Sequence, residues 1–230
     1  MKTKLKKILG RTNVVGVIAS EDDLWLAVDH PGSIDLFELR ADKYAPNKRL
    51  LKKLERPLII TVRCAGERGN APLDPRKRIA LYLRYLDLAT LIDVEASTAI
   101  QMKQVIDKAK KQGVGLIISL HVFESPFDPL DVCNAAVACT VQRGDIFKVA
   151  FFPDTLAELG QFITCAGSLE ARYGIPVAAM AMGPAYGKVS RLLFGSAKTT
   201  LVYGFLSGKV VSGQWKASEI RERLAELVDE

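Results

Sequence analysis

Eight short apolar runs, each followed by a segment with a helical pattern, constrain the fold of this chain more than any other feature. The runs cover residues 13–19, 34–40, 58–63, 91–97, 115–123, 144–152, 176–182 and 200–206. They are continuously apolar, which is typical of parallel strands covered on both faces. Capping residues such as Ser20 and Asp74 open the intervening segments. The alternation therefore predicts a parallel α/β protein.

A single (β/α)8 TIM barrel is the simplest closure of eight such units. The chain has 230 residues, which lies within the range of one barrel, so we expect one domain over residues 1–230. A doubly wound open sheet is the competing arrangement. No GxGxxG pattern follows the first run to form a dinucleotide crevice, and the barrel is therefore favoured.

Composition narrows the functional classes. Hydrophobic residues make up 49% and charged residues 25% of the chain, with a net charge of +6, which is the balance of a soluble globular protein. The basic residues are spread over several segments without interleaved aromatics, so they favour an anionic ligand and do not indicate nucleic acid. The lysine cluster in residues 2–7 is expected to be a solvated start of the chain.

Targeting and redox signals point to the cytoplasm. The opening residues lack the apolar core of a signal peptide, and no apolar run approaches the length of a membrane span. The four cysteines have neither CxxC spacing nor histidine partners, so we expect reduced thiols and no zinc site. A cytoplasmic protein without membrane contact is the expectation.

Charged and polar side chains gather where the apolar runs end, which in a TIM barrel is the end that carries the chemistry. They are Glu38, Arg40, Arg63, Glu67, Glu95, His121, Lys148, Arg191, Ser212 and Gln214. Each alone has a bland explanation, such as an ion pair, a helix cap or a packed histidine. Their collection at one barrel mouth is harder to ascribe to chance.

Lys148 lies inside an apolar run, where a lysine loses its hydration unless its charge or its nucleophilicity is used. Taken alone, it could extend its ammonium to the strand end or pair with an acid. Beside Arg40, Arg63 and Arg191 in a partly desolvated pocket, its ammonium would be destabilised and the free amine favoured. We expect this amine to condense with a ketone substrate to form an iminium ion.

The remaining residues fit the chemistry that an iminium ion permits. His121 can remove a proton from the neighbouring carbon and later protonate a departing hydroxyl group. Glu67 can hold the imidazole in one tautomer, and an arginine can bind a substrate carboxylate with two hydrogen bonds. The set indicates a Schiff-base enzyme for a carboxylated substrate, and this chemistry requires neither a metal nor a nicotinamide.

The same residues fall in short motifs that resemble type I 3-dehydroquinate dehydratase. The motifs are DLFELRAD (residues 35–42), TVRCAGERG (61–69), IDVE (92–95), ISLHVF (118–123), DIFKVA (145–150), AMAMG (179–183), SR (190–191), FGS (194–196) and SGQ (212–214). They follow the order of the family over nearly the whole chain. Together they are far more specific than any one of them.

The resemblance implies a hydro-lyase that converts 3-dehydroquinate to 3-dehydroshikimate in the shikimate pathway of aromatic amino acid biosynthesis, with no cofactor. Lys148 would form the imine, His121 would act as base and acid, and Glu67 would orient His121. Arg191 would bind the substrate carboxylate with Gln214 beside it. The remaining substrate-binding residues implied are Glu38, Arg40, Arg63 and Ser212. A homodimer is the assembly that the resemblance suggests.

Departures from the family pattern leave two alternatives open. Ser212 stands where the family has a proline before Gly-Gln, and the loop between Met182 and Ser190 is a residue longer than usual. These changes fall in loops that would cover a substrate, so a catalytically impaired barrel that serves as a binding module is one alternative. Another Schiff-base lyase, an aldolase of the transaldolase type, is the second. The presence of both Lys148 and His121 argues against an impaired barrel, and the three arginines at the mouth suit a carboxylate better than the sugar phosphate of such an aldolase.

Overall fold

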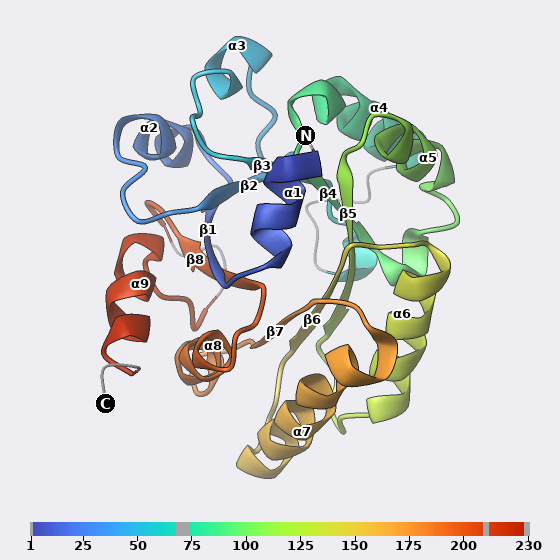
Figure 1. Ribbon diagram of the computed structural model, residues 1–230, viewed down its shortest axis with the longest axis vertical. Coiled ribbons are helices and arrows are strands. Elements are labelled where there is room, and N and C mark those ends of the chain that lie inside the picture. The colour runs from blue at the N-terminus through green and yellow to red at the C-terminus, as the bar shows by residue number, and fades with distance from the viewer. Residues whose placement is uncertain (1, 68–73, 209–211, 228–230) are drawn as a thin grey trace.

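The apolar runs form eight parallel strands in a computed structural model of the chain, which describes residues 2–67, 74–208 and 212–227 (Figure 1). The strands are β1 (Asn13–Ile18), β2 (Leu36–Arg40), β3 (Leu58–Thr61), β4 (Leu91–Glu95), β5 (Gly115–Val122), β6 (Ile146–Phe151), β7 (Val177–Ala181) and β8 (Leu201–Phe205). Residues 68 and 69, which end the motif TVRCAGERG, lie outside the described ranges.

Parallel pairing runs around the barrel in the order β7-β6-β5-β4-β3-β2-β1-β8. The remaining interface, between β7 and β8, is bridged where the N–H of Thr200 donates to the carbonyl oxygen of Val177 at 2.9 Å. The (β/α)8 barrel predicted from the sequence is therefore confirmed.

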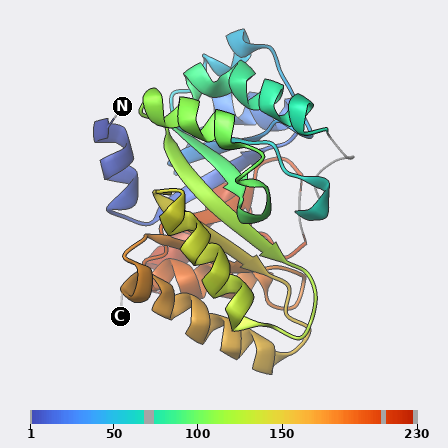
Figure 2. The ribbon, with the colours of Figure 1, turned by 90° about the vertical axis from the view of Figure 1, so that its right-hand side faces the viewer.

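Helices surround the strands (Figures 1 and 2). They are α1 (Lys2–Leu9), α2 (Glu21–Asp29), α3 (Lys48–Leu51), α4 (Pro75–Tyr85), α5 (Lys103–Lys111), α6 (Pro129–Val141), α7 (Leu156–Tyr173), α8 (Gly187–Ser196) and α9 (Ala217–Ala225), with short 3₁₀ turns η1 (Ala65–Glu67), η2 (Leu86–Leu88) and η3 (Ala96–Thr98). The predicted caps are present, since the side chains of Ser20 and Asp74 accept hydrogen bonds from the N–H groups of Asp23 and Arg76. Among the described residues, no helix is both long and apolar enough to cross a membrane.

Two apolar cores stabilise the barrel. One lies between the strands and the outer helices, where Phe127, Phe151, Phe162 and Phe194 pack with ring centres 4.7 to 5.7 Å apart. The second fills the inside of the barrel near the amino-terminal ends of the strands. Because both faces of each strand are covered, the strands are mostly apolar along their length, as is typical of parallel sheets.

The start of the chain differs from the sequence expectation. Residues 2–9 form the helix α1 rather than a solvated segment. Leu5, Ile8 and Leu9 are spaced to form one apolar stripe, and they pack into the core inside the barrel while Lys6 and Lys7 stay exposed. A side-chain carbon added at Gly115 would lie 2.9 Å from a methyl group of Leu5, so glycine at the start of β5 makes room for α1. Figure 2 shows α1, in blue, at one end of the barrel.

The inside of the barrel changes from apolar to polar along the strands. Residues two apart in a strand face the same side, so the apolar layer is followed two positions later by a polar one. The apolar layer contains Leu36, Ile59, Leu91, Ile117 and Ile146, and the following positions are Glu38, Thr61, Asp93, Ser119 and Lys148. The polar half of the interior therefore lies at the carboxyl ends of the strands, away from α1.

Candidate active site

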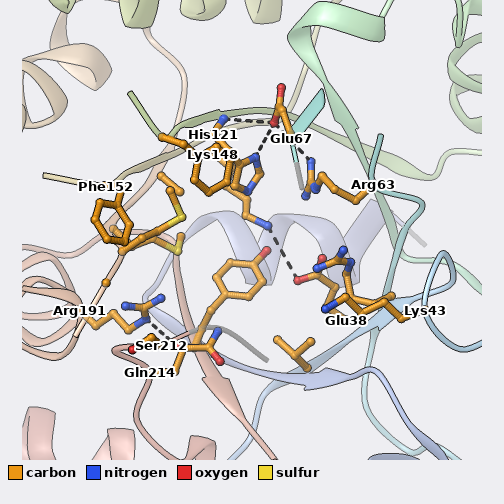
Figure 3. Close-up of a pocket in the computed structure, with 18 residues that line it drawn as sticks. Glu38, Lys43, Arg63, Glu67, His121, Lys148, Phe152, Arg191, Ser212 and Gln214 are labelled. Atoms are coloured by element: carbon orange, nitrogen blue, oxygen red, sulfur yellow. Dashed lines mark hydrogen bonds and ion pairs between the residues drawn. The ribbon is translucent and has the colours of Figure 1, made fainter. Parts of the chain in front are cut away.

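A cavity of about 340 Å³ opens at the carboxyl ends of the strands, and the nine site residues predicted from the sequence line it (Figure 3). They are Glu38, Arg40, Arg63, Glu67, His121, Lys148, Arg191, Ser212 and Gln214. Glu95 is fully buried beside the cavity, where it binds Arg63. The structure thus brings together side chains from β2, β4, β5, β6, α8 and the segments after β3 and β8.

Lys148 lies on β6 and is 4% exposed. Its Nζ atom donates to Asp93 Oδ2 at 2.9 Å and lies 3.8 Å from Glu38 Oε2. The sequence placed Arg40, Arg63 and Arg191 beside this lysine and also allowed it to pair with an acid; the structure shows contacts with two carboxylates. Asp93 was missed as a site residue, although its place two residues before Glu95 on one face of a strand was a signal that could have indicated it.

Arg63 connects the carboxylates around Lys148. Its guanidinium donates to Asp93 at 3.0 Å, to Glu95 at 3.3 Å and to the hydroxyl of Ser119 at 2.7 Å. Burial opposes ionisation of Asp93, yet Arg63 and Lys148 hold its pKa well below the usual range. Glu95 also has a lowered pKa against the effect of burial, because Arg63 and Arg78 both bind it. These groups form a buried network of paired charges.

Arg40 is paired in the same way. Its Nε and Nη2 atoms donate to the two oxygens of Asp42 at 2.9 and 2.8 Å. Asp42 also accepts the backbone N–H of Arg63 at 3.2 Å. This part of the cavity wall is therefore held together by carboxylate and guanidinium groups.

His121 and Glu67 form a pair at the end of β5. The imidazole Nδ1 and Glu67 Oε2 are 2.6 Å apart, and the same oxygen accepts the backbone N–H of His121 at 3.1 Å. These two contacts fix the orientation of the imidazole ring through Nδ1, and Nε2 takes no part in them. Burial, Arg63 and Lys148 lower the pKa of His121 well below its usual value, so the imidazole is neutral at pH 7. Burial, partly offset by Arg63, raises the pKa of Glu67 to about 7.

Arg191 is held differently from the other cations. It lies on α8, is 2% exposed, and donates only to backbone carbonyl groups among the described residues. The acceptors are the carbonyl oxygens of Tyr203 at 3.1 Å, Ala181 at 3.0 Å, Gly187 at 2.6 Å and Gly213 at 3.0 Å. Burial alone lowers its pKa to about 10. Its positive charge therefore remains available to an anionic ligand.

Two loops meet next to Arg191. Gly213 has a φ of +80°, and a side-chain carbon there would lie 1.9 Å from the carbonyl oxygen of Gly183, so only glycine allows this approach. Gln214 is buried, and its Oε1 atom has no hydrogen-bond partner among the described residues. Figure 3 shows Ser212 and Gln214 beside Arg191, across the cavity from Glu38 and Lys43.

The arrangement combines three chemical capabilities. Lys148 supplies an amine next to carboxylates that can stabilise a cation on its nitrogen, and His121 supplies a neutral base oriented by Glu67. Arg191 supplies a positive charge for an anion. Other lining residues that the sequence did not indicate are Lys43, Phe152, Met180, Met182 and Tyr203. Within the described ranges, no group of three or more His, Cys, Asp and Glu side chains is arranged to hold a metal ion.

Sequence comparisons with known proteins identify one family. Residues 20–228 match the sequence model of the family described as type I 3-dehydroquinase. A 3-dehydroquinate dehydratase from Thermococcus gammatolerans is 30% identical over 200 residues, which cover 85% of this chain and 89% of the relative.

Solved structures of similar fold carry related descriptions. A type I 3-dehydroquinate dehydratase from Clostridium difficile superimposes with a TM-score of 0.84 at 22% identity, covering 96% of this chain and 93% of that one. A 3-dehydroquinate dehydratase from Geobacillus kaustophilus gives a TM-score of 0.83 at 21% identity, covering 94% and 91%. At these identities the structural likeness supports the barrel fold, while the sequence matches identify the family.

Proposed function

The chain belongs to the type I 3-dehydroquinase family, and we propose that its cavity dehydrates 3-dehydroquinate to 3-dehydroshikimate, a step of the shikimate pathway, through an imine on Lys148. The observation that carries the proposal is the placement of three groups in one cavity. These are the buried amine of Lys148, the His121–Glu67 pair, and Arg191 without a carboxylate partner among the described residues.

Imine formation is the first step. The ammonium group of Lys148 gives up a proton, and the free amine adds to the ketone carbon to form a C–N bond. The former carbonyl oxygen leaves as water after it takes up that proton and one N–H proton of the amine. The resulting iminium nitrogen carries a positive charge where the ammonium stood, so Asp93 and Glu38 stabilise it from 2.9 and 3.8 Å away, as measured to Nζ. Arg63 binds Asp93 at 3.0 Å and, with Lys148, keeps the pKa of that carboxyl group low.

His121 performs the proton transfers of the elimination. Its neutral imidazole removes a proton from the substrate carbon next to the iminium carbon. The electron pair of the broken C–H bond then forms a double bond between these two carbons, which gives an enamine. Return of these electrons expels the hydroxyl group at the following carbon, which leaves as water with the proton from His121. Glu67 is a positioning residue, because it binds Nδ1 and thereby leaves Nε2 for substrate. Hydrolysis of the iminium releases the product and the lysine.

Arg191 binds the substrate carboxylate, and this contact orients the ring over Lys148. Its guanidinium keeps a formal charge that no described carboxylate neutralises, so an entering anion gains a charge-assisted hydrogen bond without breaking an ion pair. Ser212 and Gln214 lie beside it, where their side chains would add hydrogen bonds to the same carboxylate. Glu38, Arg40 and Arg63 hold the hydroxyl groups at the opposite wall.

Borohydride trapping tests the proposal. Reduction of the wild-type protein with 3-dehydroquinate should leave a covalent adduct that peptide mass mapping assigns to Lys148. The cavity offers a matched control, because Lys43 is a second lysine in its wall; Lys43→Met should keep the adduct and Lys148→Met should lose it. A wild-type protein that gives neither adduct nor the conjugated enone product would refute the function.

His121→Ala separates the two stages of the reaction. This variant should still form the trapped adduct and should stall before proton removal, because the amine is intact and the base is missing. Wild-type turnover in His121→Ala would refute the role of the histidine. Substrate binding without turnover in the wild-type protein would instead identify a catalytically impaired binding module.

The wider expectations are part of the same proposal. We propose a cytoplasmic homodimer that does not bind nucleic acid, on the grounds of the family resemblance and the scattered distribution of the basic residues. Light scattering of the purified protein tests the assembly, since a monomer mass at micromolar concentration would contradict it.

A further inference from the structure

Tyr203 carries a buried hydroxyl group that binds nothing among the described residues. It lies on β8, is 3% exposed and lines the cavity. The other two buried tyrosines behave differently, since the hydroxyl of Tyr82 donates to the carbonyl oxygen of Asp93 and that of Tyr85 donates to Pro46 at 2.8 Å. Buried hydroxyl groups without a partner are rare because leaving one unbonded is costly.

The position of Tyr203 associates it with the reacting amine. The Nζ atom of Lys148 lies 4.1 Å from the centre of its ring, while the hydroxyl makes no hydrogen bond to that nitrogen. Burial and the nearby carboxylates of Glu38 and Asp93 raise its pKa well above the usual value. The phenol therefore stays protonated and can act as a hydrogen-bond donor throughout the working pH range.

Packing alone does not account for this hydroxyl. A phenylalanine would present the same ring to Lys148 without a polar atom to bury. Thr61 and Asn13 also have a buried atom without a partner among the described residues, but neither lines the cavity. Tyr203 thus combines an unbonded donor, a place in the cavity wall and contact with the nucleophile.

We propose that the Tyr203 hydroxyl is a further catalytic group, which donates a hydrogen bond to the ketone oxygen of the substrate when Lys148 attacks. The inference rests on the proposed function. As the C–N bond forms, the π electrons of the carbonyl group move onto its oxygen. A donor held at that oxygen stabilises the charge that develops there. The ketone oxygen is attached to the carbon that bonds to Lys148 Nζ. Because Nζ lies over the Tyr203 ring, the Tyr203 hydroxyl is also close to Nζ.

Tyr203→Phe tests the inference with little disturbance, because the lost hydroxyl leaves no protein group without a partner. Rapid-quench borohydride trapping in a single turnover should show imine formation slowed by at least about tenfold, within the range for loss of one donor at a developing oxyanion. The melting temperature should be unchanged or higher. Tyr85→Phe is the matched control, which should lower the melting temperature and leave the trapping rate unchanged.

The outcomes separate this inference from the function on which it rests. A trapping rate equal to wild type in Tyr203→Phe would overturn the inference alone, and so would a lower melting temperature without a kinetic effect, which would reveal a structural role. A wild-type protein that forms no adduct with 3-dehydroquinate would overturn the proposed function and the inference together.

Discussion

The two sides of the cavity differ in the groups that bind their cationic side chains. On the paired side, formed by β2 to β6, each cation has a carboxylate partner; its members are Arg40, Arg63, Lys148, Asp42, Asp93 and Glu95. On the unpaired side, formed by the ends of β7 and β8, Arg191 is held by backbone carbonyl groups, with Ser212 and Gln214 beside it. Figure 3 shows Arg63, on the paired side, across the cavity from Arg191.

The difference shows how one barrel mouth can hold several arginines and still bind an anion at a defined place. The positive charge of a guanidinium bound to a buried carboxylate is already neutralised within the protein. A guanidinium held by carbonyl dipoles keeps a formal charge that a ligand can neutralise. In the proposed mechanism, the paired side provides the environment of Lys148, and the unpaired side provides the positive charge for a substrate carboxylate.

Loss of a cation from the paired side should have the largest effect. Arg63→Met leaves Asp93 and Glu95 with one fewer cation in a buried site, and we expect the free energy of unfolding to fall by about 3–5 kcal/mol. Urea denaturation measures it. Lys48→Met is the control, because the Lys48–Asp87 pair is exposed and should contribute at most about 1 kcal/mol. Equal losses in both variants would contradict the comparison.

Loss of the cation from the unpaired side should affect substrate binding more than folding. Arg191→Met removes a charge-assisted hydrogen bond to the substrate carboxylate, which corresponds to an increase in KM of about 10- to 100-fold. The loss of stability should be smaller than in Arg63→Met, because no carboxylate is left without its cation. Steady-state kinetics and denaturation of the same sample test both expectations. A KM equal to that of wild type would place the substrate anion elsewhere.

Adding a carboxylate should convert the unpaired side into a paired one. Gln214→Glu has nearly the same shape and places a negative charge beside Arg191. The new carboxylate should neutralise the guanidinium and repel the substrate, so we expect KM to rise by about tenfold, equivalent to ~1.4 kcal/mol. Binding assays at low and high salt measure the effect. If affinity were unchanged, Gln214 would not share the anion site.

The pH dependence should come from the Glu67–His121 pair next to the paired side, and its effect should be the smallest of the series. Glu67 must be ionised to accept the Nδ1 proton of His121, and its pKa is raised to about 7 by burial. Activity should therefore fall as the pH is lowered through about 7. In Glu67→Gln this decline should move to lower pH, because the pKa of His121 lies well below its usual value. A profile of kcat/KM in both proteins checks the shift, and identical profiles would refute the assignment.

Sequence patterns predicted the barrel and the nine lining residues because both depend on order along the chain. Apolar runs and caps are local signals, and residues at the ends of parallel strands must meet at one edge. The partners of each side chain could not be obtained in this way. Asp93 meets Lys148 because β4 and β6 flank β5, a strand order that no local pattern specifies. The carbonyl groups around Arg191 are backbone atoms that no residue type reveals.

The lysine-rich start shows a second limit. Its charge indicated a solvated segment, while the spacing of Leu5, Ile8 and Leu9 determined the outcome. Three apolar residues on one helical face stabilise a short helix only when a complementary surface exists, and that surface forms only after the strands assemble. The unbonded hydroxyl of Tyr203 is similar, since its lack of a partner is a property of the folded cavity.

The position of α1 also has a consequence for how molecules travel through the enzyme. With Leu5, Ile8 and Leu9 sealing the amino-terminal end of the barrel, substrate entry, water exchange and product departure all use the opposite mouth. Substrate and product must therefore enter and leave through the same opening. Because only one of them can occupy it at a time, the product should inhibit competitively.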